Sequence, residues 1–498
     1  MITPIDFITN KEQFLIVNGP AGTGKTSLIS HLINECKKLD IKYDAVAYTG
    51  KAASNLRNKC NGTGRTIHNF LYSFEPKPKE DEEGYLRGWK IDFEELDILF
   101  VDECSMISSD VRGHNVDGEN TYLFKELLYA VQTSKIKKIM LLGDTHQLPP
   151  IYKETKTKVK NEDDEIMYPT RDKDETLFPD SLNDLYIRSE FQLTGDSISL
   201  ENNWRYKEDL PSYKLSLELR QDITRKKTFI TSPKKWIVPK VEKNKLTSNE
   251  EKIIEWVIDR GGNETFNNVR ILTFTNEKAD EWNRKVRKTI GKIDKDTGEV
   301  ENISIDEPMM NLINKEYSKF YNGDSFVITE LIDSPFALQG DSDCEEHVSC
   351  KKRSNRPSEL FVQKANILLF NEDKKEEKIV NLVNRGVVAN DEKTKDAYNH
   401  RVWCDFATRN SELYKNREES LESFEKWNDT RNNDEIYATG IACYAYASTV
   451  HKTQGDSFEY VVIDLEDEDK NLKWLYTALT RTNKDFILFG KKSLTDWF

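Results

Sequence analysis

The chain has 498 residues, with 73 Lys or Arg against 87 Asp or Glu, and its formal net charge is −14. At ~150 residues per domain this length predicts about three domains, each long enough for a hydrophobic core. Gly (22) and Pro (14) are scarce while Phe (23), Tyr (20) and Trp (9) are plentiful, which excludes fibrous and wholly disordered proteins. The negative charge does not exclude nucleic-acid binding, because a basic groove can lie on an acidic body.

The apolar pattern and the cysteines indicate a cytoplasmic protein, and we expect its setting to be a bacterial cell or a phage-infected host. No stretch approaches the ~18 consecutive apolar residues of a membrane span, and residues 1–10 lack the features of a signal peptide. Seven scattered cysteines favour reduced thiols over a disulfide framework. We expect a monomer without a membrane partner.

Short apolar runs alternate with helical stretches through the first third of the chain. The predicted strands lie at 14–17, 44–49, 97–103 and 137–144, and a helical stretch follows the first of them at 26–38. This alternation predicts a parallel sheet with helices on both faces. Similar strands at 269–276, 458–465 and 485–490 indicate a second α/β domain that is split by an insertion.

A glycine-rich loop lies between the first predicted strand and the first predicted helix. The match to the phosphate-loop pattern G-x-x-x-x-G-K-[ST] runs through Gly19, Pro20, Ala21, Gly22, Thr23, Gly24, Lys25 and Thr26. Glycines let backbone N–H groups turn towards phosphate oxygens, and the helix N-terminus adds partial positive charge. The pattern predicts that Lys25 reaches the β- and γ-phosphates and that Thr26 holds Mg²⁺. A chance glycine-rich turn is the alternative, and the flanking strand and helix argue against it.

Two further strands carry polar residues to the same edge of the predicted sheet. The run 98–101 is followed by Asp102 and Glu103, at the strand end where open α/β sheets bind ligands. We predict that Asp102 holds Mg²⁺ and that Glu103 polarises the attacking water. The next strand leads to Gln147, which is placed to sense the γ-phosphate. Solvated acids at a strand end are the alternative, which the upstream loop disfavours.

Taken in chain order, these segments resemble the motifs of superfamily 1 helicases. Residues 47–53 look like motif Ia, 65–68 like the DNA-contact motif after it, 102–105 and 143–150 like motifs II and III, 200–205 like motif IV, 447–455 like motif V and 475–481 like motif VI. The resemblance is strongest to the 5′-to-3′ branch, the RecD and Dda-like helicases. It covers the two motor domains well and the insertions only loosely.

The resemblance implies an enzyme that hydrolyses ATP, with Mg²⁺, to move 5′-to-3′ on single-stranded DNA and open duplex junctions. Arg205 and Arg481 would be arginine fingers that reach the γ-phosphate from the second motor domain. Gln454 and Gly455 would lie near the nucleotide cleft. The implied strand contacts, mostly to phosphates, are Thr49, Lys51, Thr66, His68, Thr449 and His451. An ordinary core, loop or salt-bridge role is the alternative for each of these residues.

A segment inserted in the first motor domain resembles the family's separating pin. Residues 69–95 contain a polar turn at 81–84 with Phe74 on one arm and Tyr85 and Trp89 on the other, which predicts a β-hairpin. An aromatic side chain at a duplex junction can replace lost stacking of ~1–3 kcal/mol per base. The alternative is an exposed acidic hairpin with Trp89 in the core.

The expected fold is α/β, with two RecA-like parallel-sheet motor domains, an inserted hairpin and an inserted SH3-like β-barrel with helices. The predicted bounds are 1–68 and 96–190 for the first motor domain, 69–95 for the hairpin, 191–290 and 438–498 for the second motor domain, and 291–437 for the barrel and helices. Strand candidates at 325–331, 366–370 and 378–383 predict the barrel, and charged helices are expected over 395–428, with their aromatic residues against it. Residues 151–190 read as a long surface loop.

Two features depart from the family pattern. Only 18 residues precede Gly19, and Gln13 lies too close to the strand to read adenine as the family's glutamine does. Either the start is truncated or adenine is read in another way, so triphosphate hydrolysis is more firmly expected than a preference for ATP. Cys344, His347 and Cys350 offer three zinc ligands, but structural zinc uses four, which favours reduced thiols.

Two other functions compete with the helicase hypothesis. One is a P-loop ATPase that remodels a protein or RNA partner without unwinding, which the segments like motifs Ia, IV, V and VI disfavour. The other is a nucleic-acid-binding scaffold with a dead site. Lys25, Thr26, Asp102, Glu103 and Arg481 are all intact, which disfavours a dead site.

Overall fold

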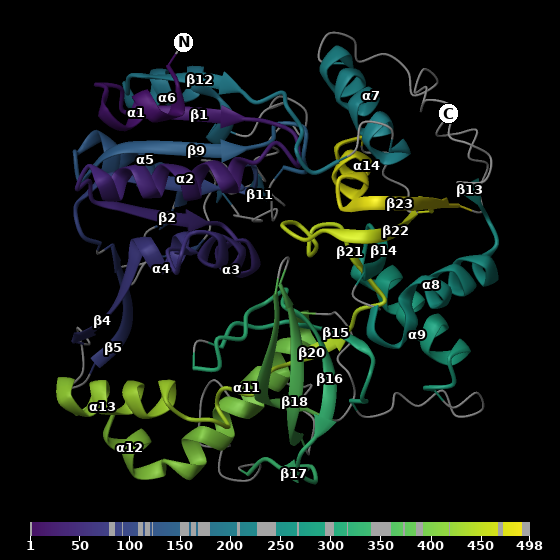
Figure 1. Cartoon of the computed structure of the whole chain (residues 1–498). Coiled ribbons are helices and arrows are strands. Elements are labelled where there is room, and N and C mark those ends of the chain that lie inside the picture. The colour runs from purple at the N-terminus through teal and green to yellow at the C-terminus, as the bar shows by residue number, and fades with distance from the viewer. Residues whose placement is uncertain are drawn as a thin grey trace.

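The computed structural model places two α/β lobes side by side, with a third, β-rich part beneath them (Figure 1). The described residues are 2–78, 85–91, 93–107, 113–114, 120–121, 123–149, 159–160, 166–167, 180–206, 210–226, 246–265, 268–293, 303–315, 317–339, 360–371, 374–384, 392–417, 419–466 and 472–490. Among them, no helix combines the length and the apolar character needed to cross a membrane.

The first lobe is built on a six-stranded parallel sheet in the order β12-β1-β9-β6-β2-β3. Its strands are β1 (Phe14–Asn18), β2 (Tyr43–Ala47), β3 (Arg65–Thr66), β6 (Leu96–Asp102), β9 (Ile136–Gly143) and β12 (Gly195–Ser199). The central strands are almost continuously apolar, because helices cover both faces of the sheet. The strand that leads into the glycine-rich loop therefore lies beside the strands that end in motifs II and III.

Helices cover this sheet on both sides. Phe14 and Ile16 pack in the same core cluster as residues of α4 (Ile67–Leu71), α5 (Leu123–Gln132) and α6 (Asp184–Phe191). Leu15 and Val17 pack instead with α1 (Pro4–Thr9), α2 (Lys25–Lys38) and α3 (Gly50–Lys59). This alternation along β1 is the period-2 pattern of a strand buried on both faces. The lobe is a three-layer α/β/α domain, as predicted.

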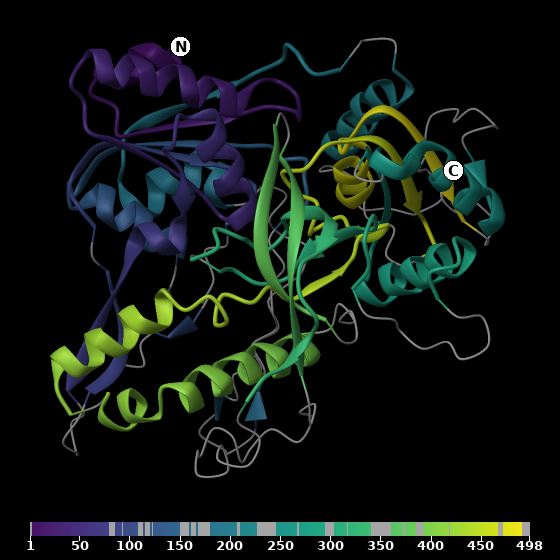
Figure 2. The same cartoon turned by 60° about the horizontal axis from the view of Figure 1, so that its bottom comes forward.

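Small elements extend the first lobe. The antiparallel hairpin of β4 (Tyr72–Pro78) and β5 (Tyr85–Ile91) pairs Phe74 with Trp89, as the sequence predicts. In Figures 1 and 2 it projects from the first lobe towards the end of the β-rich part that carries α12 and α13. The remaining pieces are η1 (Cys104–Met106), β7 (Gly113–His114), β8 (Asn120–Thr121), β10 (Val159–Lys160), β11 (Ile166–Met167) and η2 (Asp180–Leu182).

The second lobe holds a five-stranded parallel sheet in the order β13-β23-β22-β14-β21. Its strands are β13 (Leu246–Thr247), β14 (Val269–Thr273), β21 (Ala447–Thr449), β22 (Phe458–Asp464) and β23 (Thr482–Phe489). One face packs on α7 (Pro211–Lys226) and α14 (Leu472–Leu479), the other on α8 (Glu250–Thr265) and α9 (Asn276–Thr289). The two RecA-like parallel-sheet domains are thus confirmed.

The third part is an antiparallel barrel with helices, inserted between α9 and β21. Its strands are β15 (Pro308–Asn311), β16 (Ser325–Leu331), β17 (Phe336–Ala337), β18 (Phe361–Asn371), β19 (Lys374–Val383) and β20 (Ala442–Tyr444). The sheet runs β20-β15-β16-β18-β19, and a bridge between Leu382 and Gly440 brings β19 back to the chain just before β20. A Cβ on Gly440 would lie 2.7 Å from the Phe320 ring, so this closure needs glycine.

Three predictions need correction. Residues 195–199 form β12, which pairs with β1, so the first sheet extends past the predicted domain limit at 190. The predicted surface loop 151–190 includes all of helix α6 except its last residue, Phe191.

The third concerns the helices of the insertion, which are α11 (Glu392–Arg409), α12 (Ser411–Asn416) and α13 (Leu421–Asn432). Trp403, Phe406, Tyr414 and Trp427 pack on one another, with ring centroids of Phe406 and Trp427 4.8 Å apart, whereas Tyr398 of α11 packs against barrel residues.

Candidate nucleotide site and strand contacts

The glycine-rich loop has the conformation that the phosphate-loop pattern demands. Gly22 and Gly24 adopt φ values of +85° and +84°, in the left-handed region that glycine enters without strain. Lys25 begins α2, and its buried ammonium donates to the carbonyl oxygens of Gly19 at 2.7 Å and Pro20 at 3.0 Å. The positive charge therefore lies inside the loop, within reach of any phosphate that the loop holds.

The predicted magnesium ligands and the predicted base lie next to this loop. The Thr26 hydroxyl donates to Asp102 Oδ2 at 2.7 Å, and the Glu103 backbone N–H donates to Asp102 Oδ1 at 2.9 Å. Burial and the nearby charge of Glu103 raise the pKa of Asp102 to about 6. A divalent cation would relieve this penalty, and a carboxylate with a hydroxyl is a donor set that Mg²⁺ accepts.

Glu103 occupies a strained backbone position. Its φ is +50°, which is uncommon for a residue with a side chain and costs ~1–3 kcal/mol. The turn lies at the carboxyl end of β6, at the edge where the loop opens. Such an outlier at a site is the pattern expected where backbone strain aims a catalytic side chain.

Replacing Glu103 with glutamine should keep nucleotide binding and remove hydrolysis. An amide has nearly the shape of the carboxylate but cannot take a proton from water, so turnover should fall ~10²-fold or more. Fluorescent-nucleotide binding and phosphate release measure the two effects separately. Loss of nucleotide binding instead would assign to Glu103 the role that we give to Asp102.

Residues 200–206 cover the loop, and sequence reasoning missed two of them. The Asn203 amide donates to the Ala21 carbonyl at 3.2 Å, and the Trp204 N–H donates to the Gly22 carbonyl at 2.9 Å. The Trp204 side chain is 79% exposed, beside Gly24. An exposed tryptophan next to a phosphate loop offers an apolar ring to the base of a bound nucleotide. The only sequence signal was their place inside the segment that resembles motif IV.

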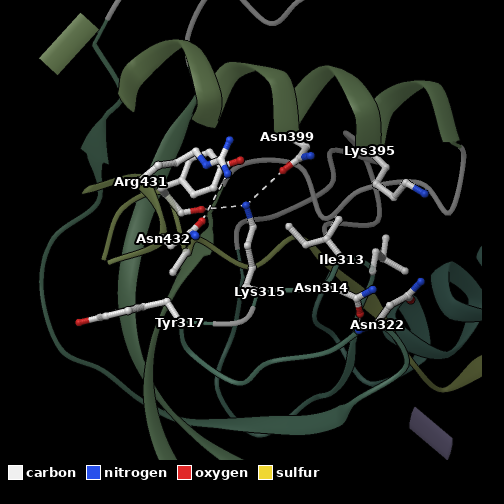
Figure 3. A pocket seen from close by; sticks show the side chains of 12 residues that line it. Ile313, Asn314, Lys315, Tyr317, Asn322, Lys395, Asn399, Arg431 and Asn432 are labelled. Atoms are coloured by element: carbon white, nitrogen blue, oxygen red, sulfur yellow. Dashed lines mark hydrogen bonds between the residues drawn. The ribbon is translucent and has the colours of Figure 1, made fainter. Parts of the chain in front are cut away.

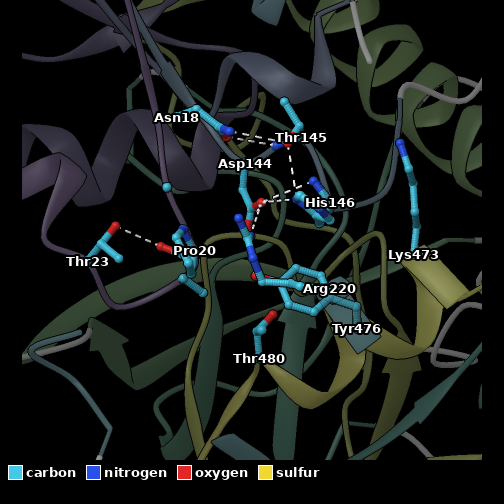
Figure 4. Close-up of polar contacts among 12 residues, drawn as sticks. Asn18, Pro20, Thr23, Asp144, Thr145, His146, Arg220, Lys473, Tyr476 and Thr480 are labelled. Atoms are coloured by element: carbon cyan, nitrogen blue, oxygen red, sulfur yellow. Dashed lines mark hydrogen bonds and ion pairs between the residues drawn. The ribbon is translucent and has the colours of Figure 1, made fainter. Parts of the chain in front are cut away.

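A buried polar network joins the two motor domains behind the loop (Figure 4). Asp144 follows β9 and accepts hydrogen bonds from Arg220 Nη1 of α7 at 2.7 Å and from the Tyr476 hydroxyl of α14 at 2.6 Å. Burial alone would raise the pKa of Asp144, but hydrogen bonding with His146 and the charge of Arg220 hold it well below the usual range. Asp144 is therefore ionised and paired across the domain boundary.

The same boundary has further contacts. The Leu148 N–H donates to the Thr477 hydroxyl at 3.0 Å, and the Tyr206 hydroxyl donates to the Thr480 carbonyl at 2.6 Å. Asn18, at the end of β1, holds Thr145 through two hydrogen bonds (Figure 4). The end of the P-loop strand, the motif III turn and α14 thus form one connected unit. Gln147 is buried in that turn.

Removing the Asp144 charge should destabilise the domain contact more than removing one of its hydrogen bonds. Asp144→Asn leaves the partly buried Arg220 without its carboxylate, which costs ~3–5 kcal/mol, whereas Tyr476→Phe removes one charge-assisted hydrogen bond of ~1.5–3 kcal/mol. Thermal unfolding midpoints of the two variants compare these losses. A larger drop for Tyr476→Phe would contradict the ion-pair account.

The two predicted arginine fingers are placed differently. Arg205 is exposed, and its Cβ lies 2.8 Å from the position that a Cβ on Gly22 would take. Arg481 is only 2% exposed and donates to the carbonyl oxygens of Thr477, Asp456 and Thr453 at 3.1, 3.2 and 3.4 Å. In this conformation Arg481 therefore binds motif V and its own helix.

In the first domain, the residues that we predict to contact the DNA strand lie at one edge of the β-sheet. Ala47 of β2 pairs with Thr66 of β3, which brings the two segments side by side. Thr49 and Thr66 cap α3 and α4, where each hydroxyl accepts a backbone N–H bond. His68 is exposed near the rings of Tyr48 and Tyr72. These residues present helix N-termini and polar side chains, which suit phosphates.

Lys51 is the least exposed of the residues that we predict to contact the DNA strand. It is 3% exposed, and its ammonium lies 3.7 Å from Asp324 of the insertion and 3.8 Å from Asp456, the residue after motif V. The Asn55 amide, one turn further along α3, donates to the Gly455 carbonyl at 2.9 Å. Helix α3 therefore joins the first motor domain to the second and to the barrel.

In the second domain, the residues that we predict to contact the DNA strand lie around the end of β21. Thr449 is buried at the edge of the sheet, where it pairs with Thr273. Burial lowers the pKa of His451, so its imidazole is neutral at neutral pH. Gln454 is buried, and neither end of its amide has a hydrogen-bond partner among the described residues. Such an unpaired amide is costly unless a ligand or another conformation pairs it.

Sequence comparisons match both ends of the chain to described families. Residues 6–153 match the model of an AAA domain, and residues 444–489 match the UvrD-like helicase C-terminal domain. Both matches agree with the resemblance to superfamily 1 helicases. The first match contains the glycine-rich loop and motifs II and III, and implies nucleotide binding. The second contains β21, β22, α14 and β23, with both Gln454 and Arg481.

Individual relatives are more distant. An uncharacterized protein of Methanocaldococcus jannaschii is 33% identical over 150 residues, which are 28% of this chain and 12% of that protein's length. The Pif1 helicase of Candida albicans is similar over 99% of this chain and 96% of its own, with 13% identity and a TM-score of 0.47. A Bacteroides Pif1 structure bound to ssDNA covers 97% and 90%, with 14% identity and a TM-score of 0.44.

The two features that depart from the family pattern are the position of Gln13 and the possible zinc ligands. The Gln13 side-chain carbonyl accepts the Thr194 N–H at 3.2 Å, so this glutamine pairs with the segment before β12. Cys344, His347 and Cys350 lie outside the described residues. Within the part of the chain that the structure describes, no group of three or more His, Cys, Asp or Glu side chains is arranged for a metal ion.

Proposed function

We propose that the protein is an ATP-dependent DNA helicase that translocates 5′-to-3′ on single-stranded DNA and separates duplex. The observation that carries the proposal is the double connection between the motor domains. Asp144, Arg220 and Tyr476 join them on the nucleotide side. On the DNA side, Lys51 of motif Ia pairs with Asp456, just after motif V, and Asn55 of α3 pairs with Gly455 of motif V. A change at one connection is therefore transmitted to the other.

On the nucleotide side, we assign ATP to the glycine-rich loop and to Lys25, with Mg²⁺ held by Thr26 and Asp102. The hydroxyl-to-carboxylate contact of 2.7 Å and the raised pKa of Asp102 support this assignment. Glu103 orients and deprotonates the attacking water, and Gln147 senses the γ-phosphate. Trp204 offers the base an exposed apolar surface.

On the strand side, we assign phosphate contacts to Thr49, Thr66, His68, Thr449 and His451. Thr49 and Thr66 lie at the amino ends of helices, where backbone N–H groups favour anions. Lys51 joins this set only if its ion pairs with Asp324 and Asp456 open. Because such contacts are mostly to phosphates, we expect binding that depends on salt and not on sequence.

The test is ATP hydrolysis with and without single-stranded DNA, followed by unwinding of duplexes with a 5′ or a 3′ tail. Stimulation by DNA and opening of the 5′-tailed duplex alone are expected. Hydrolysis that ignores DNA would favour an ATPase that remodels a protein or RNA partner. Opening of the 3′-tailed duplex alone would leave the helicase function but reverse its polarity.

Deleting residues 76–88 should abolish unwinding while DNA-stimulated hydrolysis survives. The deletion removes most of the β4–β5 hairpin, including Tyr85 and the tip between the strands. A separating pin supplies stacking at the junction, whereas the motor contacts lie in the two sheets. Strand-displacement and phosphate-release assays measure the two activities. Unwinding at the parent rate would show that the hairpin is not the pin.

A further inference from the structure

A polar cavity of about 440 Å³ lies in the insertion, away from the glycine-rich loop (Figure 3). The connection between β15 and β16 forms one wall, and α11, α13 and the residues after α13 form the others. Its cationic side chains are Lys315, Lys395 and Arg431, surrounded by the amides of Asn314 and Asn399. Among the described residues that line it, none is Asp or Glu.

Lys315 is a buried cation in this cavity. It is 6% exposed, and its ammonium donates to the Tyr437 carbonyl at 2.8 Å and to Asn399 Oδ1 at 3.2 Å (Figure 3). Both acceptors are neutral, and no carboxylate of the described residues lies within ion-pair distance. Burial and the nearby charge of Arg431 lower the pKa of Lys315 to about 8. An ammonium has three donors, and besides these two acceptors the Tyr437 ring lies 4.6 Å from it, so no anion among the described residues neutralises its charge.

Arg431 and Lys395 likewise have no carboxylate partner within the described part of the chain. Arg431 makes one long hydrogen bond, from Nη2 to Asn432 Oδ1 at 3.4 Å. Lys395 is close enough to Lys452 of motif V for the two charges to repel. Cations gathered around a cavity raise one another's energy, and a bound anion removes that cost. The cavity is therefore suited to an anionic ligand.

The position of the cavity points to the source of the anion. A Cβ on Gly50 of motif Ia would lie 3.1 Å from Asn314 Oδ1 and 3.8 Å from the Asn322 carbonyl, and both asparagines also line the cavity. The charge of Lys395 acts on Lys452 of motif V, whose pKa it helps to lower. The cavity thus adjoins both segments to which strand contacts are assigned. Its volume falls in the range of ~300–1,000 Å³ that accommodates small ligands.

We propose that this cavity binds one nucleotide of the single strand, with Lys315, Lys395 and Arg431 on its phosphate. The inference rests on the proposed function, because it extends the strand path from motifs Ia and V into the insertion. The asparagine amides supply donors and acceptors for the sugar or the base. A free phosphate compound has the same chemistry, and the experiment below distinguishes the two sources.

The test measures binding of a fluorescent oligothymidylate to the full chain by anisotropy over a series of salt concentrations. Arg431→Gln and Lys395→Gln should each weaken binding, by about tenfold if a charge-assisted hydrogen bond to phosphate is removed. The slope of log affinity against log salt should fall by ~0.7 for each phosphate that the variant no longer neutralises. Lys426→Gln is the matched control, because Lys426 is an exposed lysine on α13, outside the cavity.

Each outcome has a distinct meaning. Lys315→Gln and Arg431→Gln replace buried side chains and can fail to fold, so Lys395→Gln, at a half-buried position, carries the test, and thermal unfolding checks all four variants. Unchanged affinity and slope in a parent-like fold overturn the inference while the proposed function stands. A parent protein that binds no oligothymidylate contradicts the proposed function itself. Calorimetry with inorganic phosphate and thymidine monophosphate tests whether the cavity binds a free phosphate compound instead. Binding of these ligands that the variants lose, with oligothymidylate binding unchanged, overturns the strand assignment.

Discussion

Replacing Lys25 with alanine is expected to abolish ATP hydrolysis while single-strand binding stays near the parent level. The Lys25 ammonium is buried inside the glycine-rich loop, 2.7 Å from the Gly19 carbonyl, and it is the charge that would neutralise the β- and γ-phosphates. Losing a preorganised donor of this kind costs ~10²–10³-fold in turnover. Phosphate release and oligonucleotide anisotropy on the same preparation measure both properties.

Lys38→Ala is the matched control for this variant. Lys38 lies at the other end of the same helix, exposed and paired with Glu35 at 2.7 Å. Its removal should leave turnover unchanged, because an exposed pair of this kind contributes little. Substantial hydrolysis by a purified Lys25→Ala protein would refute the assignment of the glycine-rich loop as the ATP site.

Replacing Arg481 with alanine is expected to lower turnover by ~10³ or more, with little change in nucleotide affinity. An arginine finger acts mainly on charge that develops in the transition state. In the structure, however, the Arg481 guanidinium donates to the carbonyls of Thr453 in motif V and of Asp456 just after it. For Arg481 to reach a γ-phosphate, these bonds must open as the two domains close on the nucleotide.

Because Arg481 also makes hydrogen bonds within the protein, the test of its role as an arginine finger needs a control for stability. Alanine also removes a donor from buried carbonyls, at ~1–3 kcal/mol each, so the variant should be less stable as well. Turnover must therefore be expressed per folded molecule, from thermal unfolding of the same sample. Arg205→Ala, whose side chain is exposed beside Gly22, should lower turnover without a thermal shift. A normal rate per folded Arg481→Ala molecule would reduce Arg481 to a structural link between motifs V and VI.

Local patterns in the sequence were sufficient to predict the parts of this protein that depend on neighbouring residues. The apolar runs of β1, β6, β9, β14, β22 and β23 were readable because each strand is buried on both faces. The phosphate loop was readable because Gly22 and Gly24 adopt backbone angles that other residues avoid. The resemblance to superfamily 1 helicases rests on such local segments, and so do the residues assigned from it.

Only the tertiary structure showed which residues contact these segments from other parts of the chain. Arg220 carries no local signal, yet it pairs with Asp144, which is 76 residues away. β12 joins β1 at the edge of the first sheet, and Gly440 closes the barrel against Leu382. Lys51 looked like an accessible strand contact but is paired with Asp324 and Asp456. These contacts depend on how separate elements pack, and periodicity along the chain describes only which face of an element is buried, not which partner buries it.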